Sequence, residues 1–128
     1  MADTQKQLRV LVADDSLLYR TQVSDLVSGA GHQVLEAEDG AQAVEIAKKE
    51  LPDVIILDVM MPKMDGYTAL MTLKGLDTTR NIPVIMLTTK NEQTFKDIGA
   101  GLGAAVYMDK PPDEMQLLGH IDRLTTRA

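Results

Sequence analysis

The chain has 128 residues, of which 45% are hydrophobic and 25% charged, and its formal net charge is -6. This length suits one ordinary domain with its own core, so we expect a single domain over residues 1–128. The negative charge disfavours binding to the nucleic-acid backbone, which attracts clustered Lys and Arg. Because the chain has no cysteine, disulfides and thiolate metal sites are excluded.

The start of the chain lacks the basic and then apolar pattern of a signal peptide. No stretch approaches the roughly 20 apolar residues that a membrane-spanning helix needs. We therefore expect a cytoplasmic protein that makes no contact with a membrane.

Short apolar runs alternate with helical patterns along the whole chain, and Gly, Pro or Asp separate them. This alternation is typical of repeated βα units and predicts an α/β fold with a parallel sheet. The five strands are expected at residues 8–13, 33–37, 53–57, 83–87 and 104–108.

The helices are predicted by apolar residues that recur every three or four positions. The expected buried positions are Val23, Leu26, Val27 and Ala30 in the first helix, Ala43, Val44, Ala47 and Leu51 in the second, Tyr67, Leu70 and Met71 in the third, and Leu117, Leu118, Ile121 and Leu124 in the last. A fourth helix has a weaker stripe, and Gly99 and Gly101 interrupt it. Because each interior glycine costs roughly 1 kcal/mol relative to alanine, we expect this helix to be the most mobile.

The composition of the strands also predicts their order. The first, third and fourth strands are continuous apolar runs, as expected for central strands that are covered on both faces. The second strand contains Glu36 and the fifth begins with Ala104 and Ala105, so we expect both at the edges. This pattern favours a doubly wound, flavodoxin-like (βα)5 sheet with strand order 2-1-3-4-5. Such sheets bind ligands beyond the carboxyl ends of the strands, where the order reverses.

Polar residues follow several strands at the point where each strand ends. Asp14 and Asp15 follow the first strand, Asp58 the third and Thr88 the fourth, while Lys110 comes two residues after the fifth. Because the strands are parallel, we expect these side chains to meet at one rim of the sheet. Three carboxylates repel one another there unless a cation lies between them, and Mg²⁺ prefers carboxylate ligands.

These residues together predict phosphoryl-transfer chemistry. The ammonium of Lys110 suits a phosphoryl oxygen, and the hydroxyl of Thr88 can donate to another. With a carboxylate and a divalent cation, they supply positioning and charge neutralisation, which dominate catalysis of this reaction. Asp58 is the expected nucleophile and would become an acyl phosphate.

The chain from Leu8 to Leu124 resembles the receiver domain of two-component response regulators, the CheY-like family. The resemblance rests on Val12-Ala13-Asp14-Asp15-Ser16, Asp58-Val59-Met60-Met61-Pro62-Lys63-Met64-Asp65-Gly66, Thr88, Tyr107 and Lys110-Pro111, in family order and spacing. It implies a signalling module with only self-catalysed phosphorylation and dephosphorylation, rather than a turnover enzyme.

The resemblance assigns roles to these residues. It implies that Asp58 accepts phosphate from a phosphohistidine on a sensor histidine kinase or a phosphotransfer protein. Asp15, Asp58 and the backbone carbonyl of Met60 would bind Mg²⁺ directly, and Asp14 would act largely through water. Lys110 would pair with Asp58 before transfer and with the phosphoryl group afterwards, and the Lys110-Pro111 bond is expected to be cis.

The resemblance also implies a switch and a readout. Thr88 would move toward the phosphate, and Tyr107 would turn inward into the vacated space. A downstream protein target or output domain would read the surface of the fourth helix, fifth strand and fifth helix. Met60 and Lys90 occupy positions that tune phosphate lifetime in the family, and here they predict a phosphorylated form that lives longer than in fast family members.

Simpler structural interpretations exist for several of these residues. Asp14, Asp15 or Ser16 could cap the first helix, and Asp65 could cap the third with Gly66 relieving a tight turn. Tyr107 could be ordinary packing in an edge strand.

Two rival functions share this topology. An aspartate-nucleophile phosphatase would resemble Asp-x-Asp, but the position two beyond Asp58 is Met60. A flavodoxin-like electron carrier would need aromatic residues against its flavin, whereas this chain has no Trp and one Phe.

Overall fold

The computed structural model describes residues 7–88, 101 and 103–125. Five parallel strands form one sheet in the order β2-β1-β3-β4-β5, as the sequence predicted. The strands are β1 (Arg9–Ala13), β2 (Gln33–Ala37), β3 (Val54–Asp58), β4 (Val84–Thr88) and β5 (Val106–Asp109). The predicted fourth helix, with its glycine-dependent mobility, and Lys90 lie outside the described residues except for Gly101.

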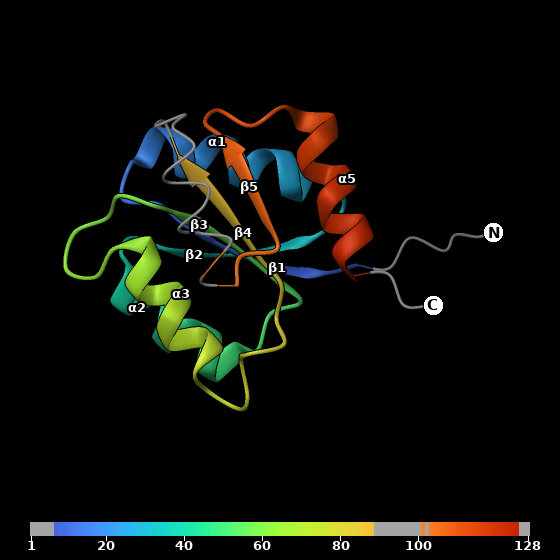
Figure 1. Cartoon of the computed structure of the whole chain (residues 1–128). Helices are drawn as coiled ribbons and strands as arrows, with labels where there is room; N and C mark the ends of the chain where they lie inside the picture. Colours follow the sequence, from blue (N-terminus) through green and yellow to red (C-terminus); the bar gives the residue numbers. More distant parts are fainter. Residues whose placement is uncertain (1–6, 89–100, 102, 126–128) are drawn as a thin grey trace.

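Two layers of helices cover the two faces of the sheet (Figure 1). The helices α1 (Leu17–Gly29) and α5 (Glu114–Thr125) lie on one face, and α2 (Gly40–Glu50) and α3 (Gly66–Lys74) lie on the other. Because successive side chains of a strand point to opposite faces, each strand contributes to both cores. On β3, for example, Ile56 packs with the α1 and α5 residues, whereas Ile55 and Leu57 pack with those of α2 and α3.

The burial of the strands matches their predicted order. All five residues of β3 and of β4 are buried, as are four of the five in β1. In contrast, β2 and β5 each bury only one residue, because each has a neighbouring strand on one side only. After β2 has been added on one side of β1, the next strand, β3, is added on the other side. The strand order therefore reverses between β1 and β3, whose carboxyl ends lie side by side.

Two predicted core residues are exposed instead. Leu51 is 50% exposed and ends α2 in a left-handed conformation with φ of 48°, so its side chain leaves the helical stripe. Met71 is 53% exposed, because α3 buries the face formed by Gly66, Ala69, Leu70 and Leu73. Met71 lies about 100° around the helix from Leu70 and faces solvent.

Side chains at the helix starts bear out part of the simpler structural interpretation. The Ser16 hydroxyl accepts a hydrogen bond from the Tyr19 backbone at 3.3 Å, and Asp65 accepts one from Thr68 at 2.8 Å. Ser16 is therefore the residue that caps α1, while Asp14 accepts a hydrogen bond from the Ser16 backbone N–H at 2.9 Å.

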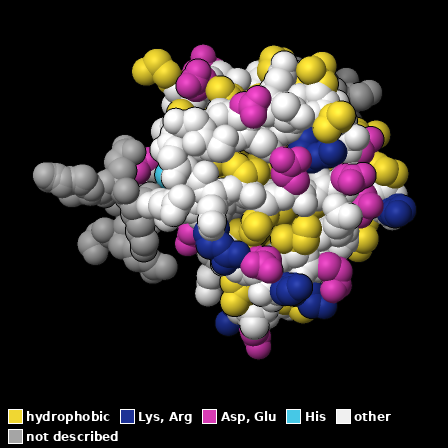
Figure 2. Space-filling model, turned by 180° about the vertical axis from the view of Figure 1, so that it is seen from behind, with side chains coloured by type: hydrophobic (Ala, Val, Ile, Leu, Met, Phe, Trp, Pro, Cys, Tyr) yellow, Lys and Arg dark blue, Asp and Glu magenta, His cyan; other side chains and the backbone are white. Residues whose placement is uncertain are grey.

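The surface carries charges of both signs. Figure 2 shows Asp and Glu interspersed with Lys and Arg over the face that is turned away in Figure 1, with hydrophobic side chains between them. Among the described helices, none combines the length and the apolar character that crossing a bilayer requires.

Candidate functional site

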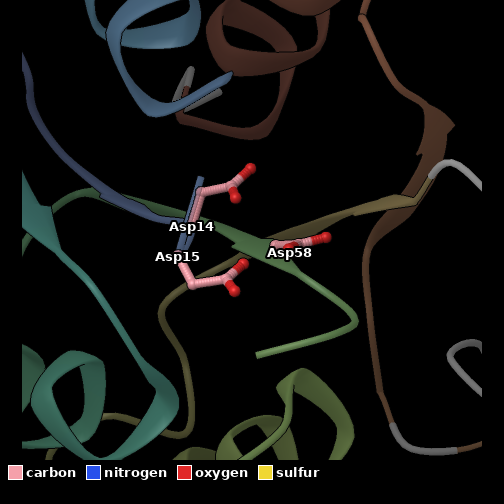
Figure 3. Close-up of side chains that lie close together, drawn as sticks. All are labelled: Asp14, Asp15 and Asp58. Atoms are coloured by element: carbon pink, nitrogen blue, oxygen red, sulfur yellow. The ribbon is translucent and has the colours of Figure 1, made fainter. Parts of the chain in front are cut away.

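Three carboxylates meet at the carboxyl edge of the sheet. Asp14 and Asp15 follow β1 and Asp58 ends β3, and all three carboxyl groups point to the same side of the strand ends (Figure 3). One oxygen from each lies within 4.8 Å of the others. Asp14 and Asp58 are buried, at 3% and 6% exposure, whereas Asp15 is open to solvent.

Lys110 reaches two of these carboxylates. Its ammonium lies 2.7 Å from an oxygen of Asp14 and 3.3 Å from an oxygen of Asp58, and its side chain is only 4% exposed. Its backbone N–H donates to the Thr88 carbonyl at 2.8 Å, which fixes it against the end of β4. The following bond to Pro111 is cis, as expected. The sequence predicted the contact with Asp58 but not the shorter one with Asp14.

The surroundings of Asp58 disfavour its charge. Burial, followed by the nearby Asp14 carboxylate, raises the pKa of Asp58 from its ordinary 3.8 to about 6, although Lys110 acts in the opposite direction. The ionised carboxylate is therefore destabilising above pH 6, and this cost is relieved as the pH falls through 6 toward 4. A bound cation would remove the same cost without protonation.

The residues present fit a divalent cation. Mg²⁺ binds oxygens at about 2.1 Å, so carboxylate oxygens within 4.8 Å of one another need only small side-chain shifts to share it. Burial and the Asp14 carboxylate raise the pKa of Asp58 although Lys110 is close, so the pocket favours a further positive charge. This acidic triad is consistent with a magnesium site.

Thr88 and Tyr107 approach one another across β4 and β5. Thr88 is 1% exposed, and Tyr107 is half-buried and packs on the core shared with α2 and α3. The Tyr107 hydroxyl lies 2.8 Å from the Tyr67 hydroxyl of α3. Burial and this partner raise the pKa of Tyr107 above its usual range, while a hydrogen bond with Thr88 lowers it. Tyr107 is thus more than edge packing, but its role as a switch stays a prediction.

The first turn of α1 contributes two residues that the sequence analysis missed. Arg20 donates to the Asp14 carbonyl at 2.8 Å and pairs with Glu36 of β2 at 2.9 Å. The Tyr19 ring lies against the Lys110 ammonium, whose nitrogen is 4.1 Å from the ring centroid. The signal in the sequence was a Tyr-Arg pair three and four residues after the capping Ser16, outside the predicted apolar stripe.

Gly66 lets the loop after β3 pack against Asp58. Its backbone N–H donates to the Val59 carbonyl at 2.9 Å, and a Cβ atom at this position would overlap the Asp58 carbonyl oxygen. A glycine here therefore lets the start of α3 lie close to the backbone of Asp58, the candidate phosphoacceptor.

Replacing Gly66 with alanine should lower the free energy of unfolding by about 1 to 3 kcal/mol, because Asp58 or the loop must move. Gly119→Ala is the matched control, since among the described residues no atom beyond its chain neighbours and its own helix backbone lies within 4 Å of a Cβ there. In the interior of α5, this change should instead stabilise the protein by about 1 kcal/mol. Urea unfolding of both variants checks the prediction, and an equal effect from the two substitutions would contradict it.

The fold and this site define a class of protein. The family model for the response regulator receiver domain matches residues 10–122, so the chain belongs to that family. It is a signalling module whose acidic pocket of Asp14, Asp15 and Asp58 is typical of magnesium-dependent aspartate phosphorylation in two-component systems. This assignment favours neither the phosphatase nor the flavodoxin-like electron carrier.

The chain matches one curated relative over almost its whole length and others only in part. Protein PilH of Pseudomonas aeruginosa is 40% identical over 114 residues, which cover 89% of this chain and 94% of PilH. Response regulator PleD of Caulobacter vibrioides is 37% identical over 117 residues, which cover 91% of this chain and 26% of PleD. The chain therefore spans almost all of one relative but about a quarter of the other.

Solved structures are similar throughout the fold. A response regulator from Chloroflexus aurantiacus has a TM-score of 0.90 at 30% identity, covering 95% of this chain and all of that one. The receiver domain of a Pseudomonas aeruginosa sensor histidine kinase, with a magnesium ion coordinated in its active-site cleft, has a TM-score of 0.87 at 26% identity and covers 94% and 98% of the two chains. CheY of Borrelia burgdorferi, in a complex with CheX, BeF3 and magnesium, has a TM-score of 0.86 at 28% identity and covers 94% and 90%. Receiver domains thus interact with other regulators.

Proposed function

We propose that residues 1–128 act as one receiver domain that accepts a phosphoryl group on Asp58 in a magnesium-dependent reaction. The observation that carries this proposal is the contact of one buried ammonium, that of Lys110, with both Asp14 and Asp58 inside the acidic triad. A structural role alone does not require a third carboxylate, Asp15, within 4.8 Å of these two.

The proposed magnesium ligands are Asp15, Asp58 and the backbone carbonyl of Met60, with Asp14 acting mainly through water. The magnesium-bound receiver domain of the Pseudomonas kinase, which shares this fold, supports the choice of ion. When bound, the cation would neutralise negative charge on the carboxylates and on the incoming phosphoryl group.

In the proposed reaction, a carboxylate oxygen of Asp58 attacks the phosphorus atom of a phosphohistidine. The new O–P bond forms as the P–N bond breaks, and the imidazole nitrogen leaves with the bonding electrons and takes up a proton. Lys110 moves its ammonium from the carboxylate to a phosphoryl oxygen, and the Thr88 hydroxyl donates to another. These two residues supply charge and position rather than a proton.

The proposed phosphate donor is a sensor histidine kinase or a phosphotransfer protein in the cytoplasm. The exposed side chains of Leu17 and Leu18 begin α1, two and three residues after Asp15, and would offer this donor an apolar contact. A downstream protein or an output domain would read the change at Thr88 and Tyr107. The CheX complex of a structurally similar CheY supports a protein partner of this kind. Direct binding to nucleic acid or to a membrane is not part of this proposal.

The test is labelling with a small acyl-phosphate donor, which needs no cognate kinase. Incubation with Mg²⁺ should add the mass of one phosphoryl group to the intact protein, and chelation of Mg²⁺ with EDTA should prevent it. Peptide mapping should place the group on the segment that contains Asp58. Labelling that is unchanged in EDTA would reject the magnesium-dependent reaction.

Met60 predicts slow loss of the phosphoryl group. Its side chain is 59% exposed and has no amide, hydroxyl or carboxyl group that could orient an attacking water. Met60→Asn introduces an amide near the phosphoacceptor and should accelerate hydrolysis several-fold. The half-life of the phosphorylated protein, followed by intact mass after removal of the donor, measures this effect. Met71→Asn, a change at a similarly exposed methionine on α3, is the control, and equal half-lives for the two variants would contradict the prediction.

A further inference from the structure

We propose that Tyr19 is a positioning residue for Lys110: the face of its ring holds the lysine ammonium at the site and restrains it from turning toward solvent. This inference deepens the proposed function, because Lys110 is the group that must meet the phosphoryl oxygens. Nothing in the sequence motifs assigned a role to Tyr19.

The geometry of the ammonium carries the inference. The Lys110 nitrogen lies 4.1 Å from the centroid of the Tyr19 ring, well inside the roughly 6 Å range of a cation-π contact. The same nitrogen lies 2.7 Å from Asp14 and 3.3 Å from Asp58. The ammonium is therefore held between two carboxylates and one aromatic face, with 4% of the side chain exposed.

An aromatic ring suits this position because Lys110 must change its partners. A lysine side chain is a flexible stem, and its ammonium is strongly hydrated. In phosphoryl transfer, the ammonium exchanges a carboxylate oxygen for a phosphoryl oxygen. The ring attracts the cation without competing for the phosphoryl group, whereas a third carboxylate would repel that group. Tyr19 can thus remain in contact while the other partners change.

The fold fixes the ring from the first turn of α1. The Tyr19 backbone N–H donates to the hydroxyl of Ser16, which caps the helix. The next residue, Arg20, donates to the Asp14 carbonyl at 2.8 Å. The start of α1 is thereby joined to the β1 end of the site, and the ring faces Lys110 from a rigid element. A side chain on a helix is positioned more accurately than one on a loop.

The test compares three residues at position 19 in the full chain. Tyr19→Leu keeps an apolar side chain without a π face and should slow labelling by the acyl-phosphate donor about tenfold at saturating Mg²⁺. Tyr19→Phe removes only the hydroxyl and should label within about twofold of the original rate, because the ring face is kept. Thermal unfolding of each variant verifies that the fold is intact.

A double-mutant cycle identifies the partner of the ring. In a Lys110→Met background, Tyr19→Leu should have no further effect on the labelling rate, because the cation is already absent. If Tyr19→Leu labels as fast as the original chain, or Tyr19→Phe as slowly as Tyr19→Leu, the inference is overturned. Equal slowing by Tyr19→Leu with and without Lys110 would also overturn it.

A spectroscopic measurement separates this inference from the proposed function. The ring current of Tyr19 should shift the Lys110 side-chain proton resonances, and Tyr19→Leu should abolish that shift while Tyr19→Phe preserves it. This result does not depend on phosphorylation. Failure of the original chain to label would therefore reject the proposed function while the NMR comparison still decides the contact. Unshifted Lys110 resonances in the original chain would reject the contact itself.

Discussion

Asp58→Asn is expected to take up no phosphoryl group from an acyl-phosphate donor in the presence of Mg²⁺. The neutral amide is a poor nucleophile and lacks the charge that a cation at this site would bind. Asp58 ends β3 beside Lys110 and is 6% exposed, so the substitution changes the chemistry with little change in volume. Intact mass under conditions that label the original chain measures the loss.

Asp65→Asn is the matched control for this substitution. Asp65 lies in the loop after β3 and caps α3, a role that asparagine also fills. This variant should be labelled like the original chain. If Asp58→Asn were labelled to the same extent, the phosphoacceptor would be another residue.

The stability of Asp58→Asn shows whether a loss of labelling reflects chemistry. Since burial and Asp14 raise the pKa of Asp58 to about 6, its ionised form destabilises the fold above that pH. The neutral amide should therefore increase the free energy of unfolding at pH 7 without Mg²⁺, by about 1 to 2 kcal/mol after allowance for solvent screening. The gain should shrink as the pH falls from 6 toward 4. A variant that is less stable at pH 7 would contradict this account of the site.

Lys110→Met should slow labelling of Asp58 by about tenfold or more. The methionine keeps an apolar stem but loses the ammonium that contacts Asp14 and Asp58, so the two carboxylates face each other without it. Developing charge on the phosphoryl oxygens then loses a preorganised cation, an effect that can exceed two orders of magnitude at enzyme sites. The rate of mass gain at saturating Mg²⁺ is the measurement.

Lys48→Met is the control for the removal of one positive charge. Lys48 is exposed on α2 and pairs only loosely with Glu45, at 3.5 Å. Its removal should leave the labelling rate unchanged. If Lys110→Met also labelled at the original rate, the buried ammonium would have no role in the reaction, and the Tyr19 inference would lose its target.

The order of the strands was predictable because burial is encoded locally. A strand such as β3, covered on both faces, needs apolar residues at every position, whereas the edge strand β2 can carry Glu36. Parallel pairing then brings the ends of β1 and β3 together whatever the details of packing. Asp14, Asp15 and Asp58 could therefore be assigned to one site before any distance was known.

The two wrong predictions of burial fell at the limits of helical faces, where the apolar spacing continued but the buried helical face did not. The apolar spacing extended the stripe of α2 to Leu51, yet the chain turns there into a left-handed conformation. Met71 is apolar, as a buried residue would be, but it follows Leu70 by one position and lies outside the buried face of α3. A hydrophobic pattern indicates that a face exists, while its exact limits depend on neighbouring elements.

The sequence by itself determined the sheet, its order and the three acids with their lysine, because strand burial and strand ends follow from residue type and spacing. Only the tertiary structure revealed the partners of that lysine other than Asp58. The shorter contact with Asp14, the ring of Tyr19 and the hydroxyl pair of Tyr67 and Tyr107 join elements distant along the chain. Such contacts depend on side-chain directions and on helix packing angles, and no periodicity in a linear sequence records them.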